Sequence, residues 1–144
     1  MILAKDVNIR LMRKTPISLQ VELKIEATVN PSESSDKVIH AIANIFQGSL
    51  PELKYGSMVT ARCLDLRCLA IIYDQVRSRA ALGVLRRMLI DNRISNTTWF
   101  LLNKQAAFAG VVAVIEDESE SPLGPIRVKI RCDKLEELVD WLAP

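Results

Sequence analysis

An uninterrupted alternation of apolar and polar side chains over residues 19–29 constrains the fold of this chain most strongly. Every second side chain of this segment is apolar, from Leu19 to Val29. Because successive side chains of a strand point to opposite faces, this pattern predicts a strand with one buried and one solvent-exposed face. Asn30 and Pro31 end the strand, and an apolar stripe that includes Ile42 predicts a helix after it.

The remaining patterns predict further strands and helices. Strands are expected over residues 57–64, 97–102, 108–115 and 126–131, and helices over residues 66–78, 79–94 and 134–142. Residues 108–115 are almost wholly apolar, which predicts a central strand. The order β-α-β-α-α-β-β-β-α predicts an α+β fold: a two-layer sandwich with one mostly antiparallel sheet of about five strands and helices on one face. Residues 1–16 are interpreted as an N-terminal extension and residues 17–144 as a single domain.

Composition excludes several classes of protein. The chain has 144 residues, and no apolar run approaches the ~20 residues of a membrane span. Charged residues interrupt residues 1–14, so no signal peptide is expected and a cytoplasmic protein is predicted. Three cysteines and the single histidine, His40, lack the spacing of a zinc site. We therefore expect buried free thiols, no disulfide, no metal and no cofactor.

Charge is unevenly distributed along the chain. Residues 75–110 hold six basic residues and one acidic residue, whereas residues 111–144 hold four basic and eight acidic residues. The net charge of the whole chain is only +2. Segregated charge of this kind can steer a charged partner.

The basic segment supplies the first candidate site. Arg79, Arg86 and Arg93 are spaced by seven residues, and Arg87 adjoins them. On one continuous helix this spacing places the three arginines within about 40° of each other, as a row that could follow an RNA phosphate backbone. The alternative is that their stems lie along the edge of the core and their charged ends stay in water.

A second candidate is Asn103-Lys104-Gln105, between two predicted strands. These side chains are suitable ligands for phosphate, sugar or base edges. The alternative is an Asn-capped turn that needs no ligand.

Two further segments are interpreted mainly as structural. Arg127, Lys129 and Arg131 share one face of the last predicted strand, and either bind RNA or pair with neighbouring acidic side chains. Residues 121–125, Ser-Pro-Leu-Gly-Pro, predict a rigid turn that sets strand register.

Five segments together resemble a known family. They are Val29-Asn30-Pro31-Ser32-Glu33, Asn44-Ile45-Phe46, Leu85-Arg86-Arg87, Asn103-Lys104-Gln105-Ala106-Ala107 and Ser121-Pro122-Leu123-Gly124-Pro125-Ile126. The resemblance is to uncharacterised small archaeal proteins described as RNA-binding, with a related group described as exosome subunits. It implies a sandwich fold similar to the 5S-rRNA-binding ribosomal protein of the large subunit. It implies no activity and no catalytic residues.

Three functional hypotheses follow. The first is a non-catalytic RNA-binding module that contacts phosphate and sugar through Arg79, Arg86, Arg87, Arg93, Asn103, Lys104 and Gln105. The second is a homo-oligomeric scaffold, such as a homodimer, in which residues 126–131 form an exposed sheet edge. An enzyme acting on a small molecule is the weakest hypothesis, because no nucleophile with a matching base is recognisable.

Overall fold

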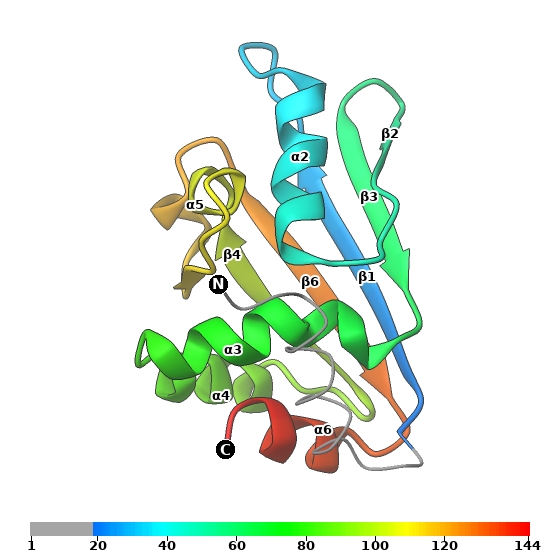
Figure 1. The fold of residues 1–144 in the computed structure, drawn as a ribbon, viewed down its shortest axis with the longest axis vertical. Coiled ribbons are helices and arrows are strands. Elements are labelled where there is room, and N and C mark those ends of the chain that lie inside the picture. The colour runs from blue at the N-terminus through cyan, green and yellow to red at the C-terminus, as the bar shows by residue number, and fades with distance from the viewer. Residues whose placement is uncertain (1–18) are drawn as a thin grey trace.

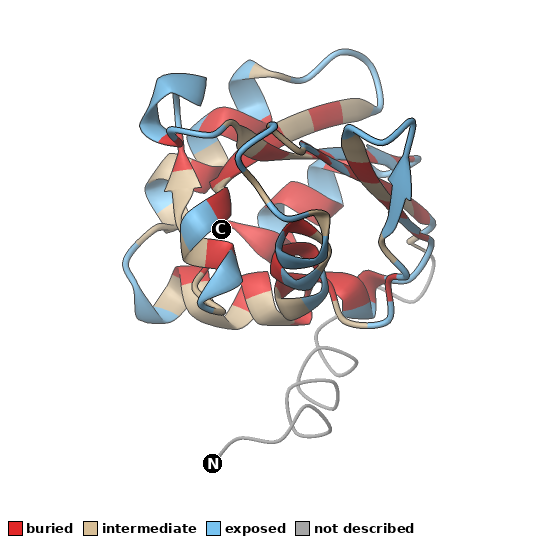
Figure 2. Ribbon diagram, turned by 90° about the horizontal axis from the view of Figure 1, so that it is seen from above, coloured by how far each residue is buried: buried red, intermediate tan, exposed pale blue. Residues whose placement is uncertain are grey.

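The computed structural model describes residues 19–144, which form one open antiparallel sheet with helices against one of its faces (Figures 1 and 2). The strands are β1 (Val21–Thr28), β2 (Glu52–Lys54), β3 (Met58–Cys63), β4 (Thr97–Asn103), β5 (Val114–Ile115) and β6 (Pro125–Cys132). The helices are α2 (Ser35–Ile45), α3 (Ala70–Ser78), α4 (Leu82–Asp91), α5 (Lys104–Phe108) and α6 (Leu135–Leu142), with single 3-10 turns at Leu66–Leu69 and Glu118–Glu120. The predicted α+β sandwich is confirmed, with six strands where about five were expected. The predicted extension, residues 1–16, lies outside the described residues.

The sheet order β2-β3-β1-β6-β4-β5 places β1 and β6 at its centre. The alternation predicted for β1 is confirmed, since Leu23 and Ile25 are buried while Lys24 and Glu26 are exposed. The idea that residues 126–131 form a sheet edge is wrong, because β6 pairs with β1 on one side and β4 on the other. Its inward apolar residues fill the core between the sheet and the helices.

The prediction of a central strand over residues 108–115 is also wrong. Phe108 ends α5, and only the two residues of β5 form a strand, at the edge of the sheet. Between α5 and β5, the Gln75 side chain forms hydrogen bonds with the backbone. Its amide donates to Gly110 O at 2.9 Å and accepts from Val112 N at 2.8 Å. A side chain thus replaces the strand partner that these backbone groups would otherwise need.

The helix predicted over residues 79–94 is shorter than expected. Arg79 lies at the C-terminal end of α3, Ala80 adopts a positive φ of 55°, and α4 begins only at Leu82. A positive φ cannot continue a right-handed helix, so the chain turns sharply between α3 and α4. None of the helices in residues 19–144 combines the length and apolar character that crossing a membrane requires.

The expectation of three free thiols is wrong. Cys63 ends β3 and is joined by a disulfide to Cys68, which lies in the following 3-10 turn. Asp65 begins this turn by accepting a hydrogen bond from Arg67 N at 2.9 Å, and the turn brings the two cysteines together. Cys132 is a free, buried thiol, and burial raises its pKa.

Candidate functional site

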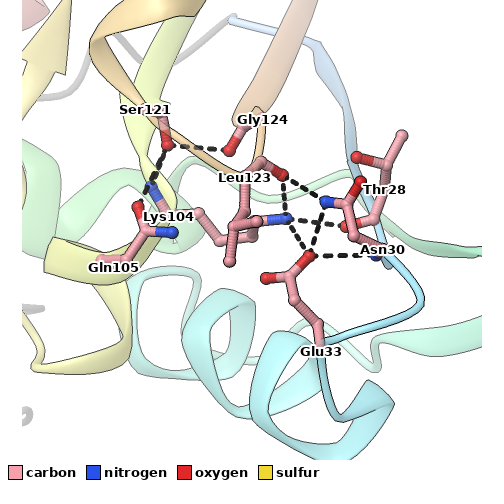
Figure 3. Close-up of polar contacts among 8 residues, drawn as sticks. All are labelled: Thr28, Asn30, Glu33, Lys104, Gln105, Ser121, Leu123 and Gly124. Atoms are coloured by element: carbon pink, nitrogen blue, oxygen red, sulfur yellow. Dashed lines mark hydrogen bonds and ion pairs between the residues drawn. The ribbon is translucent and has the colours of Figure 1, made fainter.

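Three of the segments that resemble the family, residues 29–33, 103–107 and 121–126, meet at one end of the sheet. At their centre lies Lys104 (Figure 3). Its side chain is only 3% exposed. Its ammonium group donates to Glu33 Oε1 and Thr28 O, both at 2.8 Å, and to Leu123 O at 2.7 Å. An ammonium group has three protons, so these three partners satisfy it completely.

Glu33 holds the other side of this junction. Its Oε1 also accepts from the backbone N–H of Asn30 at 3.0 Å and from the Asn30 side-chain amide at 2.8 Å. The same amide donates to Leu123 O at 2.7 Å (Figure 3). Burial alone would raise the pKa of Glu33, but the hydrogen bonds from Lys104 and Asn30 outweigh it and hold the pKa below its usual 4.5. Glu33 is therefore a charged partner of Lys104 at neutral pH.

The turn over residues 121–125 joins the junction through Ser121, which is buried. Its hydroxyl group donates to Gly124 O at 2.7 Å, accepts from Lys104 N at 3.2 Å and lies 3.3 Å from Gln105 Oε1 (Figure 3). Gly124 has a φ of 89°, which favours glycine. The predicted structural role of this turn agrees with these contacts.

The predicted Asn-capped turn is present at the start of α5. Asn103 accepts from Ala106 N at 2.8 Å and donates to Glu120 O at 3.1 Å. Beside it, an open hollow of about 280 Å³ lies between α2 and α5, lined in part by Lys37, Gln105 and Phe108. Gln105 is exposed, whereas Asn103 and Lys104 are occupied by internal hydrogen bonds. The geometry makes this junction a connection between β1, α2, β4 and β6.

The four candidate arginines do not form one helical row. Arg79 lies at the end of α3, Arg86 and Arg87 lie on α4, and Arg93 follows α4. Three of them form ion pairs with acidic residues from the C-terminal part of the chain. These pairs are Arg86–Asp140 at 3.0 Å, Arg93–Glu136 at 3.2 Å and Arg87–Glu116. The basic and acidic segments recognised in the sequence therefore neutralise each other in part within the fold.

Arg93 and the Asn103-Lys104-Gln105 turn also lie at opposite ends of β4. Arg93 precedes this strand and Lys104 follows it. Seven strand residues at about 3.3 Å each separate the two by roughly 20 Å. The structure thus does not bring Arg93 and this turn into one site.

A third surface is the sheet face opposite the helices. Its outward side chains include five cations. The sequence prediction did not include two of them, Lys24 and Arg62, as site residues, although the alternation of their strands places them on this face. The cations are Lys24, Arg62, Arg127, Lys129 and Arg131. Glu22, Lys24 and Glu26 of β1 lie directly opposite Arg131, Lys129 and Arg127 of β6.

Only part of this charge is neutralised. Glu22 forms an ion pair with Arg62, and Glu118 of the acidic segment forms one with Arg127 at 2.6 Å. The Arg127 guanidinium also lies 4.7 Å from the centre of the Trp99 ring. Lys24, Lys129 and Arg131 have no ion pair within 4.0 Å among residues 19–144. We name these five cations, together with Trp99, the open sheet face.

The open sheet, its helical layer and its charged surfaces define a small α+β sandwich protein. A family model described as RNA binding matches residues 22–132. A UPF0201 protein of Sulfurisphaera tokodaii is 41% identical over 123 residues, which cover 83% of this chain and 85% of that protein. A second UPF0201 protein, from Pyrobaculum arsenaticum, is 36% identical over 133 residues, covering 88% and 90%.

Solved structures agree with this assignment. The crystal structure of the UPF0201 protein from Methanococcus jannaschii has a TM-score of 0.71 at 31% identity, and the match covers 85% of this chain and 92% of that one. Another crystal structure of an uncharacterised UPF0201 protein has a TM-score of 0.74 at 26% identity, covering 85% and 93%. The chain belongs to the UPF0201 family, for which the matching family model describes RNA binding.

Proposed function

We propose that this protein is a non-catalytic RNA-binding module that contacts phosphate and sugar groups through surface cations. The observation that carries the proposal is the presence of five basic side chains on the sheet face opposite the helices, in a member of a family whose model is described as RNA binding. Basic side chains on a rigid surface can neutralise successive phosphates and release their counterions. A cytoplasmic location and the expected likeness to a ribosomal protein belong to the same proposal.

The residues predicted from the sequence contribute unequally to this proposal. Arg79, Arg86, Arg87 and Arg93 remain candidate contacts, because an exposed ion pair contributes only about 0–1 kcal/mol and an arginine can exchange a carboxylate for a phosphate. Gln105 is exposed and remains a candidate, as does the partly exposed Asn103. We leave Lys104 out of the contact set, since its ammonium group is buried and fully hydrogen-bonded.

The proposal that the protein is not an enzyme draws on its chemically reactive groups. Among residues 19–144, no three His, Cys, Asp or Glu side chains are grouped to hold a metal ion. The free thiol, Cys132, is buried and its pKa is raised by burial, which disfavours the nucleophilic thiolate. Lys104 has no free proton with which to engage a substrate.

Binding to a labelled RNA hairpin, measured by fluorescence anisotropy at several KCl concentrations, tests the proposed function. We expect the logarithm of the affinity to fall linearly with the logarithm of the salt concentration. No binding at low salt would overturn the proposal. The RNA should also remain intact after prolonged incubation, and its cleavage or modification would overturn the non-catalytic part.

The second candidate function is self-association as a scaffold or homodimer. Residues 126–131, which were expected to form the exposed sheet edge of such a scaffold, lie in a central strand. The edge strand β2, however, adjoins exposed apolar side chains. Leu50 is 87% exposed and Tyr55 is 95% exposed. Light scattering at tens of micromolar tests this candidate, and a strictly monomeric mass would eliminate it.

A further inference from the structure

The open sheet face contains a row of like charges that folding alone does not favour. Lys24 on β1 lies directly opposite Arg62 on β3 and directly opposite Lys129 on β6. Directly opposite side chains in a sheet have Cβ atoms about 4.5–5.5 Å apart, and like charges at such positions are destabilising. Three cations therefore stand side by side across three neighbouring strands.

The nearby acidic side chains leave much of this repulsion in place. Glu22 and Glu26 lie two residues to either side of Lys24 on β1, and Glu22 is occupied by Arg62, whose Nε donates to Glu22 Oε2 at 2.8 Å. The attraction of Arg62, and more weakly of Lys24 and Arg131, keeps the pKa of Glu22 below its usual 4.5, so it carries its full charge at neutral pH. With Glu26, which lies opposite Arg127, two carboxylates of β1 thus share this face with five cations. The excess positive charge can be balanced by an anion from outside the protein.

A hollow of about 120 Å³ lies among these side chains. Its lining consists of Glu22, Lys24, Thr97, Lys129 and Arg131. Three of these five residues are cations, and they come from the two central strands of the sheet. The backbone of both strands is held by pairing on each side, so the cations are presented from a rigid support.

Trp99 extends the row on the next strand. It lies opposite Lys129, so the order across β3, β1, β6 and β4 is Arg62, Lys24, Lys129, Trp99. Strands are about 4.8 Å apart, which makes this row roughly 14 Å long. Cations beside an aromatic ring form the combination by which sheet surfaces bind an RNA backbone and stack a base.

We propose that the open sheet face is the RNA-binding site, with a backbone phosphate held in the hollow between Lys24, Lys129 and Arg131 and a neighbouring base or ribose against Trp99. This assignment rests on the proposed function and names its surface. The helix-layer arginines differ in that three of the four already have carboxylate partners. On the open face, Lys24, Lys129 and Arg131 form no ion pair within residues 19–144, so a bound phosphate would offset their charge.

Two matched triple variants test the assignment. Lys24→Ala/Lys129→Ala/Arg131→Ala removes three charges from the open face, and Arg79→Ala/Arg86→Ala/Arg93→Ala removes three charges from the helix layer. Each is titrated against the same labelled RNA hairpin and against a labelled single-stranded oligouridine, at several KCl concentrations. We expect the open-face variant to bind about tenfold more weakly or worse, with a salt slope lower by about 0.7 for each lost phosphate contact. The helix-layer variant should stay within about threefold of the wild type.

The outcomes separate this inference from the proposed function. If the wild-type protein binds no RNA at low salt, the proposed function fails. If the wild type binds but the helix-layer variant loses as much affinity as the open-face variant, or more, the function stands and the open-face assignment is overturned. Binding of poly-glutamate as tight as that of RNA would overturn the assignment in favour of an acidic protein partner.

Two controls keep the result interpretable. The three replaced residues are exposed, and removing their mutual repulsion should leave the thermal midpoint of the triple variant unchanged or higher. A second readout is tryptophan fluorescence. RNA should change the emission of the wild type and of Trp141→Phe, which retains Trp99, but not that of Trp99→Phe. A response that persists in Trp99→Phe, or an equal response to inorganic phosphate alone, would overturn the placement of the RNA backbone and base.

Discussion

Replacing Lys104 by methionine should destabilise the protein without weakening RNA binding by the folded protein. Methionine has a similar length but cannot donate to Glu33, Thr28 O or Leu123 O. Removing one partner of a buried ion pair costs about 3–5 kcal/mol, because the other charge stays buried without compensation. Here Glu33 keeps two hydrogen bonds from Asn30, so the lower end, about 3 kcal/mol, is expected.

Urea unfolding at neutral pH, followed by circular dichroism, measures this loss. For a chain of this size, 3 kcal/mol corresponds to a thermal midpoint lower by roughly 10 °C. The matched control is Lys37→Met, which removes an exposed lysine beside the same hollow and should change stability by no more than about 0.5 kcal/mol. A Lys104→Met protein within about 0.5 kcal/mol of the wild type would refute the structural role of Lys104.

A double variant sharpens this test. Replacing both Lys104 and Glu33 by methionine removes both charges together, and a buried pair exchanged for apolar side chains often costs little. The double variant should therefore be more stable than Lys104→Met by about 1 kcal/mol or more. Purely additive losses would show that the two residues do not act as a pair.

Three further predictions concern the scaffold. The pKa of Glu33 is lower in the folded state, so its contribution to stability is present above its unfolded pKa and is lost as pH falls below about 4.5. In Glu33→Gln, the urea midpoint should therefore fall less steeply between about pH 6 and pH 3 than in the wild type. An unchanged slope would contradict this prediction. Cys63→Ser should cost about 2 kcal/mol and make stability insensitive to reductant, and a wild type equally insensitive would count against the disulfide. Gly124→Ala should lower the free energy of unfolding by about 1–2 kcal/mol, because φ is positive and a Cβ would lie 3.0 Å from Thr28 Oγ1. The control Gly83→Ala, at an exposed helical position, should be neutral or stabilising. Equal effects of the two substitutions would contradict this prediction.

The strands with long alternating patterns were predictable from the sequence. Residues 19–29 and 126–131 alternate strictly, and this pattern determined which side chains face the core and which face outward. The same alternation places Lys24 and Lys129 on one face, so part of the open sheet face could be inferred before the fold was known. The position of Arg62 beside Lys24 could not be inferred in this way, because it depends on the pairing of β1 with β3.

Other features depend on contacts between segments that are far apart in the chain. Residues 108–115 are apolar, but the Gln75 side chain binds their backbone groups and prevents a full strand. The break before α4 depends on a positive φ at Ala80, for which alanine carries no local signal. The three-residue strand β2 is too short to show a periodicity.

Contacts between distant segments also explain why some candidate site residues have structural partners instead of free surface groups. Lys104 looked like a surface ligand because it lies in a polar turn, yet Glu33, 71 residues away, makes it a buried structural group. The arginines of the helix layer looked unpaired because their partners lie 29 to 54 residues further along the chain. Local sequence could not reveal these partners, since ion pairing is decided by the tertiary fold.

The most direct test of the open-face assignment is a two-dimensional NMR titration of the ¹⁵N-labelled protein with the RNA hairpin. We expect the largest amide shift changes on the open-face residues of β1 and β6, above all Lys24, Lys129 and Arg131, together with a change at the Trp99 indole N–H. Changes confined to α4 and its flanking arginines, or to residues 103–105, with β1 and β6 unaffected, would contradict the open-face assignment.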